Sequence, residues 1–326
     1  MKNSKVLVTG GLGFVGSFLS KRLVDLGYSV RVFDNSSRGS LEKISGYEKD
    51  LEIIEGDMRD AQSVAEAVKG VEIVYHLGAV NGTRFFYEEP EKVLEVNVKG
   101  VINTLEASMK AGVRRFIFSS SSEIYNEPEH IPTPETERAM IPDITNPRFS
   151  YAGSKLIGEL FCMNYARKSA IEPVIIRYHN IYGPHMAYDH VIPEIFLKIK
   201  KASDDFQKKQ VEIELQGTGE ETRAFCYVDD AVEGTIIASQ KAAKSDIVHI
   251  GTDKEIKIKD LVSQIGNVLG VRVNTKITAL RAGSTPRRCP DISKLKKMGY
   301  QPKIDLNEGL KRTLEWYKQN TKLQVA

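Results

Sequence analysis

Residues 9–16 read Thr9-Gly10-Gly11-Leu12-Gly13-Phe14-Val15-Gly16. This stretch follows a short apolar run at residues 5–9 and opens an apolar-periodic segment, so its glycines lie at a turn between a strand and a helix. Glycine lets the backbone turn tightly and approach a pyrophosphate, which the free N–H groups and the dipole of the helix N-terminus stabilise. The stretch therefore predicts a dinucleotide-binding βαβ unit.

Short apolar runs alternate with helical stretches on both sides of this turn. Runs rich in Val, Ile and Phe occur at residues 5–9, 29–33, 51–54, 73–77 and 115–118, and a further candidate strand occurs at 173–178. Because this rhythm is typical of repeated βαβ units, we predict an α/β fold with a Rossmann-type doubly wound parallel sheet. After Gly183-Pro184 the pattern changes to helices near 192–201, 229–240, 259–269 and 306–318, which predict a smaller mixed α/β C-terminal domain.

Composition excludes several classes of protein. The 326 residues include 46 Lys and Arg against 43 Asp and Glu, and a net charge of +3 is too balanced for a nucleic-acid-binding surface. The three cysteines lack CxxC spacing, so we expect neither a disulfide framework nor a metal site, and a reducing cytoplasm fits best. The apolar run Val6-Leu7-Val8 is too short for a signal peptide or a membrane span, so no membrane association is expected.

The choice of dinucleotide depends on Asp34, which follows the second predicted strand 18 residues beyond Gly16. A carboxylate at this place accepts hydrogen bonds from the adenosine ribose hydroxyls and repels the 2′-phosphate of NADP. The sequence therefore favours NAD, while Arg38 nearby keeps NADP as the alternative.

The TGxxGxxG spacing from Thr9 to Gly16 resembles the extended short-chain dehydrogenase/reductase family, in particular its NAD-dependent nucleotide-sugar epimerases and dehydratases. The resemblance extends over roughly residues 5 to 315. It implies an adenine contact at Asp57 in the turn Gly56-Asp57-Met58-Arg59-Asp60, and a cofactor channel lined by His76-Leu77-Gly78-Ala79. Asn97-Val98-Lys99-Gly100 is similar to the family's NVxGT helix segment. The implied cofactor-binding residues are Gly10, Gly13, Phe14, Val15, Gly16, Asp34, Asn35, Asp57, Met58, Leu77, Gly78, Ala79, Asn97, Ser119, Tyr151, Lys155, Tyr178, Asn180 and Ile181.

Tyr151-Ala152-Gly153-Ser154-Lys155 contains the YxxxK pair of that family, and its chemistry also follows from spacing. Residues four apart on a helix share a face, so the Tyr151 phenol and the Lys155 ammonium reach one pocket. A free phenol has a pKa of about 10, and nearby positive charge favours the phenolate. Tyr151 would then take a proton from a sugar hydroxyl while NAD oxidises the same carbon. The family pattern places the third catalytic residue, which bonds the reacting hydroxyl, at Ser121.

Three further segments resemble nucleotide-sugar members of the family. Residues 177–184 are similar to RxxNxYGP, in which Asn180 contacts the substrate diphosphate, and residues 217–230 are similar to GxGxxxRxFxYVxD, in which Arg223 reaches a phosphate. Arg288 is a second candidate anion ligand, because arginine donates two parallel hydrogen bonds to phosphate oxygens. The implied substrate-binding residues are Asn81, Thr83, Ser121, Ser122, Glu123, Tyr151, Asn180, Arg223 and Arg288.

The resemblance also implies how the chain is divided. Residues 1–180 would form the NAD-binding Rossmann domain with the catalytic residues. Residues 181–326 would mainly bind the nucleotide sugar, with some chain crossing back to the first domain. A homodimer is expected from family habit, through helices near residues 91–111 and 150–169.

The net reaction remains open at this stage. Oxidation at sugar C4 to a 4-keto species serves a 4-epimerase, a 4,6-dehydratase and a uronic acid decarboxylase alike, and we expect 4-epimerisation because it requires the fewest extra groups. Glu123 is expected in the catalytic set, as a second base or as a substrate hydrogen-bond acceptor. Asn146-Pro147-Arg148-Phe149-Ser150-Tyr151 resembles the PR-x-x-Y context of the decarboxylases. A non-catalytic NAD-binding sensor is the alternative from another class.

Two positions depart from the family pattern and leave the shape of the sugar pocket open. Asn126 replaces the glycine that usually follows Tyr125, and Gly78 replaces an alanine.

Overall fold

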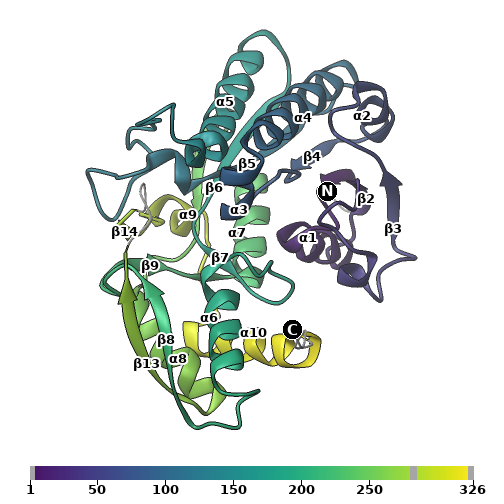
Figure 1. The fold of residues 1–326 in the computed structure, drawn as a ribbon. Coiled ribbons are helices and arrows are strands. Elements are labelled where there is room, and N and C mark those ends of the chain that lie inside the picture. Colours follow the sequence, from purple (N-terminus) through teal and green to yellow (C-terminus); the bar gives the residue numbers. More distant parts are fainter. Residues whose placement is uncertain (1–3, 280–284, 322–326) are drawn as a thin grey trace.

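The computed structural model describes residues 4–279 and 285–321; the outermost ends of the two expected domains therefore lie outside the described residues. The strands of its large sheet are β1 (Lys5–Thr9), β2 (Ser29–Asp34), β3 (Leu51–Glu55), β4 (Ile73–His76), β5 (Arg115–Ser121), β6 (Glu172–Tyr178) and β11 (Asp246–Ile250). These seven strands lie in the order β11-β6-β5-β4-β1-β2-β3, and each neighbouring pair is parallel (Figure 1). The predicted doubly wound sheet is confirmed.

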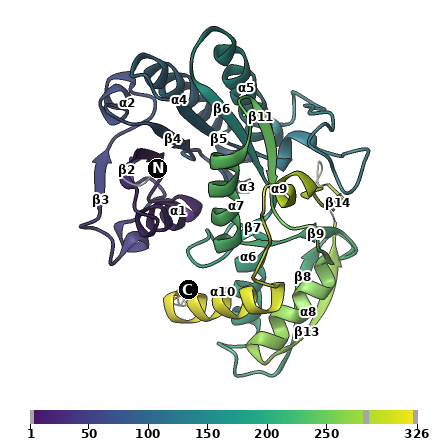
Figure 2. The same cartoon turned by 180° about the vertical axis from the view of Figure 1, so that it is seen from behind.

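Helices cover both faces of this sheet, and others belong to the smaller lobe. The α-helices of the described residues are α1 (Phe14–Asp25), α2 (Ala61–Ala67), α3 (Thr83–Glu88), α4 (Pro90–Lys110), α5 (Ser150–Tyr165), α6 (Val191–Ala202), α7 (Val228–Lys241), α8 (Ile258–Leu269), α9 (Ser293–Lys297) and α10 (Leu306–Asn320). Helices α2, α4 and α5 form one layer, whereas α1 and α7 pack together on the opposite face, which Figure 2 shows from behind. Among the described residues, no helix combines the length and the apolar character needed to cross a membrane.

The strand β11 was not predicted, although the other six were. Its sequence Asp246-Ile247-Val248-His249-Ile250 is short and half polar, and it lies within the region expected to form the smaller domain. It pairs in register with β6, from Asp246 opposite Val174 to Ile250 opposite Tyr178. Because the hydrogen-bonding partner of β11 lies some 70 residues earlier in the chain, local periodicity gives no signal for it.

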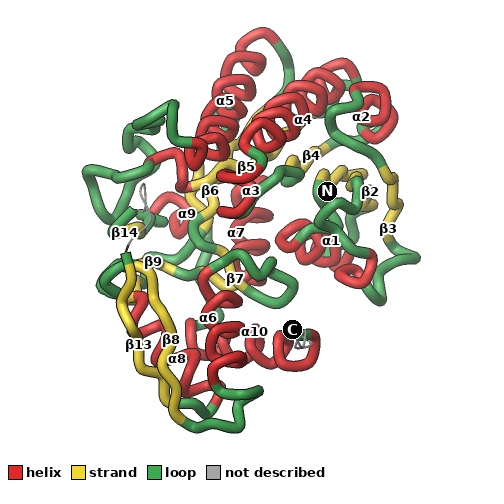
Figure 3. Tube along the Cα trace, viewed as in Figure 1, coloured by secondary structure: helices red, strands yellow, loops and turns green. Residues whose placement is uncertain are grey.

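The smaller lobe combines strands with the helices α6, α8 and α10, which pack against one another. The helix predicted near residues 229–240 is α7, and it packs on the large sheet instead. The strands outside the large sheet are β7 (Ile181–Tyr182), β8 (Gln210–Gln216), β9 (Thr222–Ala224), β10 (Cys226–Tyr227), β12 (Glu255–Lys257), β13 (Arg272–Thr278) and β14 (Arg287–Arg288). The parallel pair β8–β13 lies beside α8 at the end remote from α4 and α5 (Figure 3). β14 joins β9 in parallel, with Arg288 opposite Arg223.

The glycine turn after β1 depends on close backbone approach. Gly10 has a φ of +68°, and a Cβ added there would lie 2.7 Å from Cα of Gly78. A Cβ on Gly16 would lie 2.1 Å from the carbonyl oxygen of Gly10. Both positions therefore admit only glycine, and the turn brings the start of α1 against the loop that follows β4.

Candidate active site

A large cavity lies at the carboxyl ends of the parallel strands, where the strand order reverses between β1 and β4. Ligands of open α/β sheets bind at this switch point. The cavity has a volume of about 510 Å³. It is lined by 24 of the 26 predicted site residues: Gly10, Gly13, Phe14, Val15, Gly16, Asp34, Asn35, Asp57, Met58, Leu77, Gly78, Ala79, Asn81, Thr83, Ser119, Ser121, Ser122, Glu123, Tyr151, Lys155, Tyr178, Asn180, Ile181 and Arg288.

Asn97 is a predicted cofactor residue that does not line the cavity. Its amide oxygen accepts a hydrogen bond from Val80 N at 2.7 Å, and its amide nitrogen donates to Val80 O at 3.2 Å and to Ser154 Oγ at 3.0 Å. These bonds tie the loop after β4 to α5. Asn97 thus supports the wall of the cavity from behind, and the sequence motif alone did not distinguish that role from ligand contact.

Arg223 is the other predicted residue that lies off the cavity. Its guanidinium donates to the carbonyl oxygens of Thr222 at 2.8 Å and Thr285 at 2.6 Å. Arg288 follows Thr285 closely, lines the cavity, and keeps a buried Nε without a hydrogen-bond partner among the described residues. Arg223 therefore braces the segment that carries Arg288.

Asp34 holds the glycine turn and the next loop together. One carboxylate oxygen accepts from Leu12 N at 3.0 Å and the other from Ser36 N at 2.9 Å. Each oxygen retains a lone pair, which fits the ribose hydroxyls of a dinucleotide. Arg38 points elsewhere, since its guanidinium donates to Asn81 O and lies 4.0 Å from the Asp189 carboxylate. Arg38, the residue that left NADP as an alternative, therefore interacts with Asn81 and Asp189 and does not extend toward Asp34.

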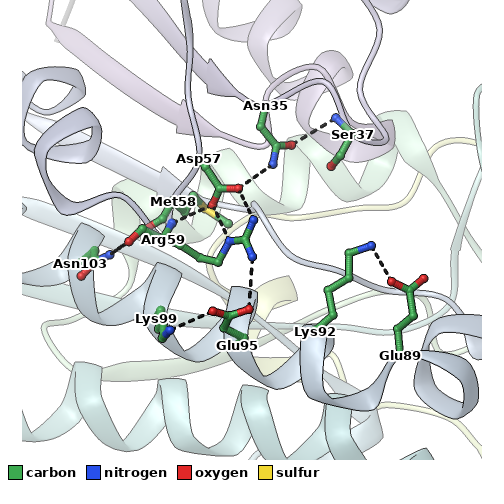
Figure 4. Close-up of polar contacts among 10 residues, drawn as sticks. All are labelled: Asn35, Ser37, Asp57, Met58, Arg59, Glu89, Lys92, Glu95, Lys99 and Asn103. Atoms are coloured by element: carbon green, nitrogen blue, oxygen red, sulfur yellow. Dashed lines mark hydrogen bonds and ion pairs between the residues drawn. The ribbon is translucent and has the colours of Figure 1, made fainter.

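Asp57, the predicted adenine contact, is a fixed carboxylate on the cavity wall (Figure 4). Arg59 donates to it from Nε at 3.0 Å and from Nη2 at 2.8 Å, and Asn35 Nδ2 donates at 3.2 Å. The hydrogen bond from the Arg59 side chain lowers the pKa of Asp57 to about 2. Arg59 in turn pairs with Glu95, which also pairs with Lys99. The network keeps Asp57 ionised and aligned as a hydrogen-bond acceptor.

Tyr151 and Lys155 lie one turn apart at the start of α5 and both face the cavity. The Tyr151 ring stacks on Phe86 with centroids 5.1 Å apart, and Lys155 Nζ lies 5.6 Å from the Tyr151 ring centroid. Burial and the negative charge of Glu123 hold the pKa of Tyr151 above that of a free phenol, and the hydrogen bond with Ser121 and the positive charge of Arg38 offset this rise only in part. The structure thus brings Ser121, Tyr151 and Lys155 together as the sequence predicted.

Lys155 is a buried amine, with Nζ donating to Ser119 O at 2.8 Å. Burial lowers its pKa to about 7, whereas the unfolded chain holds this proton up to a pKa of about 10.4. The unfolded state therefore binds more protons between these values, and stability rises with pH across that window. From pH 7 to pH 9, the wild type should gain about 2 kcal/mol in free energy of unfolding relative to Lys155→Met.

Denaturant unfolding at the two pH values measures this difference. The exposed side chain of Lys49 provides a control, because Lys49→Met should keep the wild-type pH dependence. An identical pH dependence of the wild type and Lys155→Met would contradict a pKa lowered by burial.

Glu123 is engaged with arginines. Its carboxylate lies 2.5 Å from Arg288 Nη1 and 3.7 Å from Arg148 Nη2. Burial alone would raise the pKa of Glu123, but the charges of Arg288 and Arg148 outweigh it and lower the pKa to about 2. In this arrangement Glu123 is an ionised partner of two cations, which makes it a weak base and excludes it as a proton donor near neutral pH.

One of the two departures from the family pattern has a structural reason. A Cβ on Gly78 would lie 2.5 Å from the sulfur of Met58, so glycine at 78 accommodates the methionine. Asn126 has a φ of +52° with a ψ of −101°, a backbone conformation that glycine adopts most easily, so nothing in the structure explains asparagine at this position.

Sequence reasoning missed part of the cavity wall. Its residues include Arg38, Phe86, His185, Met186, His190 and Phe225. His185 and Met186 directly follow Gly183-Pro184, the end of the segment similar to RxxNxYGP. Their position next to that motif could have predicted that they line the cavity. The others lie in segments that reach the cavity only through the tertiary fold.

Known proteins are similar to this chain over nearly its whole length. The model of the NAD dependent epimerase/dehydratase family matches residues 6–251. A putative UDP-glucose 4-epimerase of Methanocaldococcus jannaschii is 34% identical over 97% of this chain and 99% of its own length. The UDP-N-acetyl-alpha-D-glucosaminuronate decarboxylase of Bacillus cytotoxicus is 32% identical over 97% of this chain and 98% of its own length.

Solved structures are similar over nearly the whole chain. The UDP-N-acetylglucosamine 4-epimerase from Methanobrevibacter ruminantium, in complex with UDP-N-acetylmuramic acid, has a TM-score of 0.88 at 28% identity and covers 98% of this chain and 100% of its own. A dTDP-glucose 4,6-dehydratase from Streptomyces venezuelae with NAD bound has a TM-score of 0.86 at 26% identity and covers 97% of each chain.

Proposed function

Because this chain belongs to the NAD-dependent epimerase/dehydratase family and is an NAD-dependent enzyme, we propose that it is a 4-epimerase of a nucleotide-diphosphate sugar. The sugar is oxidised at C4 to a 4-ketone, turns in the pocket, and is reduced on its other face. NAD, when bound, supplies the oxidant for the first half and the reductant for the second. The glycine turn, Asp34 and Asp57 are the residues that would hold it.

The proton of the C4 hydroxyl would pass to the Tyr151 phenolate, whose formation the positive charges of Lys155 and of bound oxidised NAD would favour. Ser121 can bond the same oxygen, because its hydroxyl accepts from Glu123 N at 3.2 Å and is held beside the Tyr151 phenol by a hydrogen bond between them. Lys155, held by Ser119 O, adds positive charge beside the phenolate when it is protonated. Returning the proton from Tyr151 in the second half restores the resting state.

The ion pair of Glu123 with Arg288 is the observation that favours epimerisation. A 4,6-dehydratase must remove a C5 proton and protonate the leaving C6 hydroxyl, which requires an acid and a base beyond Tyr151. Glu123 lies in the right part of the cavity, but two arginines hold it ionised. Epimerisation needs only the Ser121, Tyr151 and Lys155 set.

A uronic acid decarboxylase is the second candidate, supported by the arginines around Glu123. Arg148 and Arg288 both contact Glu123, and the charge of Arg223 also affects it, so this part of the site carries net positive charge. Such charge would bind a sugar C6 carboxylate, and loss of carbon dioxide from a 4-keto uronate needs no added acid. The similarity to the Bacillus cytotoxicus decarboxylase supports the same reading.

Mass spectrometry with proton NMR of the reaction products distinguishes these candidates. The protein would be incubated with NAD and a panel of UDP-, GDP-, CDP- and dTDP-sugars that includes uronic acids. An unchanged mass with a new sugar spectrum is the result expected. Loss of carbon dioxide would establish the decarboxylase instead, and loss of water the 4,6-dehydratase. Bound NAD without turnover of any donor would favour a sensor.

We also propose a homodimer formed through α4 and α5, which lie side by side (Figure 1). These helices carry large apolar side chains that are partly or largely exposed, with Leu94 at 39%, Ile157 at 37% and Leu160 at 56%. Burial of such side chains between two copies removes apolar surface from water.

The double variant Ile157→Lys/Leu160→Lys should shift the protein from dimer to monomer mass in light scattering, because charges in an apolar interface lose their hydration. The variant Leu41→Lys changes a side chain that is equally exposed, at 55%, but lies away from α4 and α5, and it should remain dimeric. A monomeric wild type at working concentration would reject the proposed dimer.

A further inference from the structure

Three loops from distant parts of the chain meet at Arg38 on the wall of the cavity. Arg38 follows β2, and its guanidinium donates to the carbonyl oxygen of Asn81, in the loop after β4. The same guanidinium lies 4.0 Å from the carboxylate of Asp189, in the loop that precedes α6. It also lies 5.1 Å from the centroid of the Phe85 ring. The Arg38 side chain thus connects the loop after β2 with the loop after β4 and with the loop that precedes α6.

Asp189 is packed closely against this junction. A Cβ on Gly82, which has a φ of +131°, would lie 2.0 Å from Asp189 Oδ2, so only glycine leaves room for the carboxylate. The other oxygen, Oδ1, is buried and has no hydrogen-bond partner among the described residues. Its charged neighbour is Arg38. The Nε2 atom of His190 lies 3.8 Å away, but burial lowers the pKa of that imidazole, which favours its neutral form. A buried carboxylate oxygen in this position is stabilised chiefly by the cation opposite it.

The junction lies on the wall of the cavity, close to Tyr151. Arg38, Asn81 and Gly82 line one part of the wall, while His185, Met186 and His190 from the Asp189 loop line another. The Arg38 charge is also close enough to Tyr151 to lower the pKa of its phenol. The contact between Arg38 and Asp189 therefore joins two walls of the cavity near the reacting groups.

We infer that Arg38 and Asp189 form a latch that joins the loops over the cofactor pocket and slows the release of NAD. An enzyme that oxidises and then reduces the same substrate must keep one NAD molecule through both halves of the cycle. A contact between the two walls that must break before the dinucleotide leaves meets this need. The inference requires NAD binding and does not depend on which sugar is processed.

The test measures NAD release without any sugar. Protein loaded with radiolabelled NAD is diluted into unlabelled NAD, and the loss of label gives the dissociation rate. Arg38→Met removes the charge and keeps the length of the side chain, so dissociation should become about 10-fold faster, an effect between those of losing an exposed and a buried ion pair. Asp189→Asn removes the opposite charge with little change of shape and should also accelerate dissociation. The double variant should be no faster than Arg38→Met, because the two residues act through one contact.

Arg84→Met is the matched control. Arg84 lies at the same 5.1 Å from the Phe85 ring centroid, but it pairs with Glu88 on the exposed side of α3. Its replacement should leave NAD dissociation at the wild-type rate. Wild-type dissociation in both Arg38→Met and Asp189→Asn would overturn the latch, as would effects that add fully in the double variant. If Arg38→Met fails to fold, Asp189→Asn measured against Arg84→Met still decides the question.

Discussion

Replacing Tyr151 with phenylalanine should lower turnover about 10³-fold, the contribution expected of a positioned acid–base group. The phenol is the group in the cavity that bonds Ser121 and lies beside Lys155, so its loss removes proton transfer to and from the sugar hydroxyl. The ring itself is retained, and with it the stacking on Phe86. Bound NAD should therefore stay at the wild-type level, measured by absorbance after gel filtration.

A control on the same helix separates chemistry from packing. Tyr165 also lies on α5, with its hydroxyl 3.2 Å from Glu106 Oε1 and remote from the cavity lining. Tyr165→Phe should keep full turnover. Wild-type turnover in Tyr151→Phe, with the substrate identified by the product panel, would remove Tyr151 from the catalytic set.

Replacing Gly16 with valine should abolish NAD binding. The first carbon of any side chain at this position would lie 2.1 Å from Gly10 O, far inside contact distance, and the obstacle is backbone rather than a movable side chain. The start of α1 would have to move away from the glycine turn, which displaces the N–H groups that face the pyrophosphate. Calorimetric titration with NAD, after removal of any cofactor carried through purification, measures the loss.

Gly153→Ala is the matched control for this variant. Gly153 lies within α5, and a Cβ there would meet nothing nearer than 4.0 Å, so alanine should bind NAD normally and stabilise the helix. Wild-type NAD affinity in Gly16→Val would show that the turn does not hold the pyrophosphate.

Much of the active site was predictable because its motifs are local. Tyr151 and Lys155 share a helix face by spacing alone, and the glycines of residues 10–16 occupy a single turn. Residues at the ends of parallel strands, such as Asp34 and Ser121, converge on one edge once the sheet is predicted. For these residues, the regular geometry of a helix or a parallel sheet fixes the position in space once the position in the sequence is known.

Other assignments depended on partners that the motifs do not contain. Asn97 and Arg223 lie in segments that match family motifs, yet the side chains of both form hydrogen bonds with backbone groups outside the cavity. Arg38 raised the question of NADP because it follows Asp34 closely, but Asn81 and Asp189 draw its guanidinium away. Proximity in sequence did not reveal the direction of any of these side chains.

The sequence by itself determined the doubly wound sheet, the glycine turn and the shared helix face of Tyr151 and Lys155, because each follows from strand periodicity, helix spacing or a glycine that no other residue can replace, while the prediction of Ser121 came from the family resemblance. Only the tertiary structure decided the place of β11, the engagement of Arg38 and the state of Glu123. Glu123 meets Arg288 across 165 residues of chain, and this ion pair keeps its carboxylate ionised. Charge state depends on which groups the fold brings within a few ångströms, and no local pattern encodes that distance.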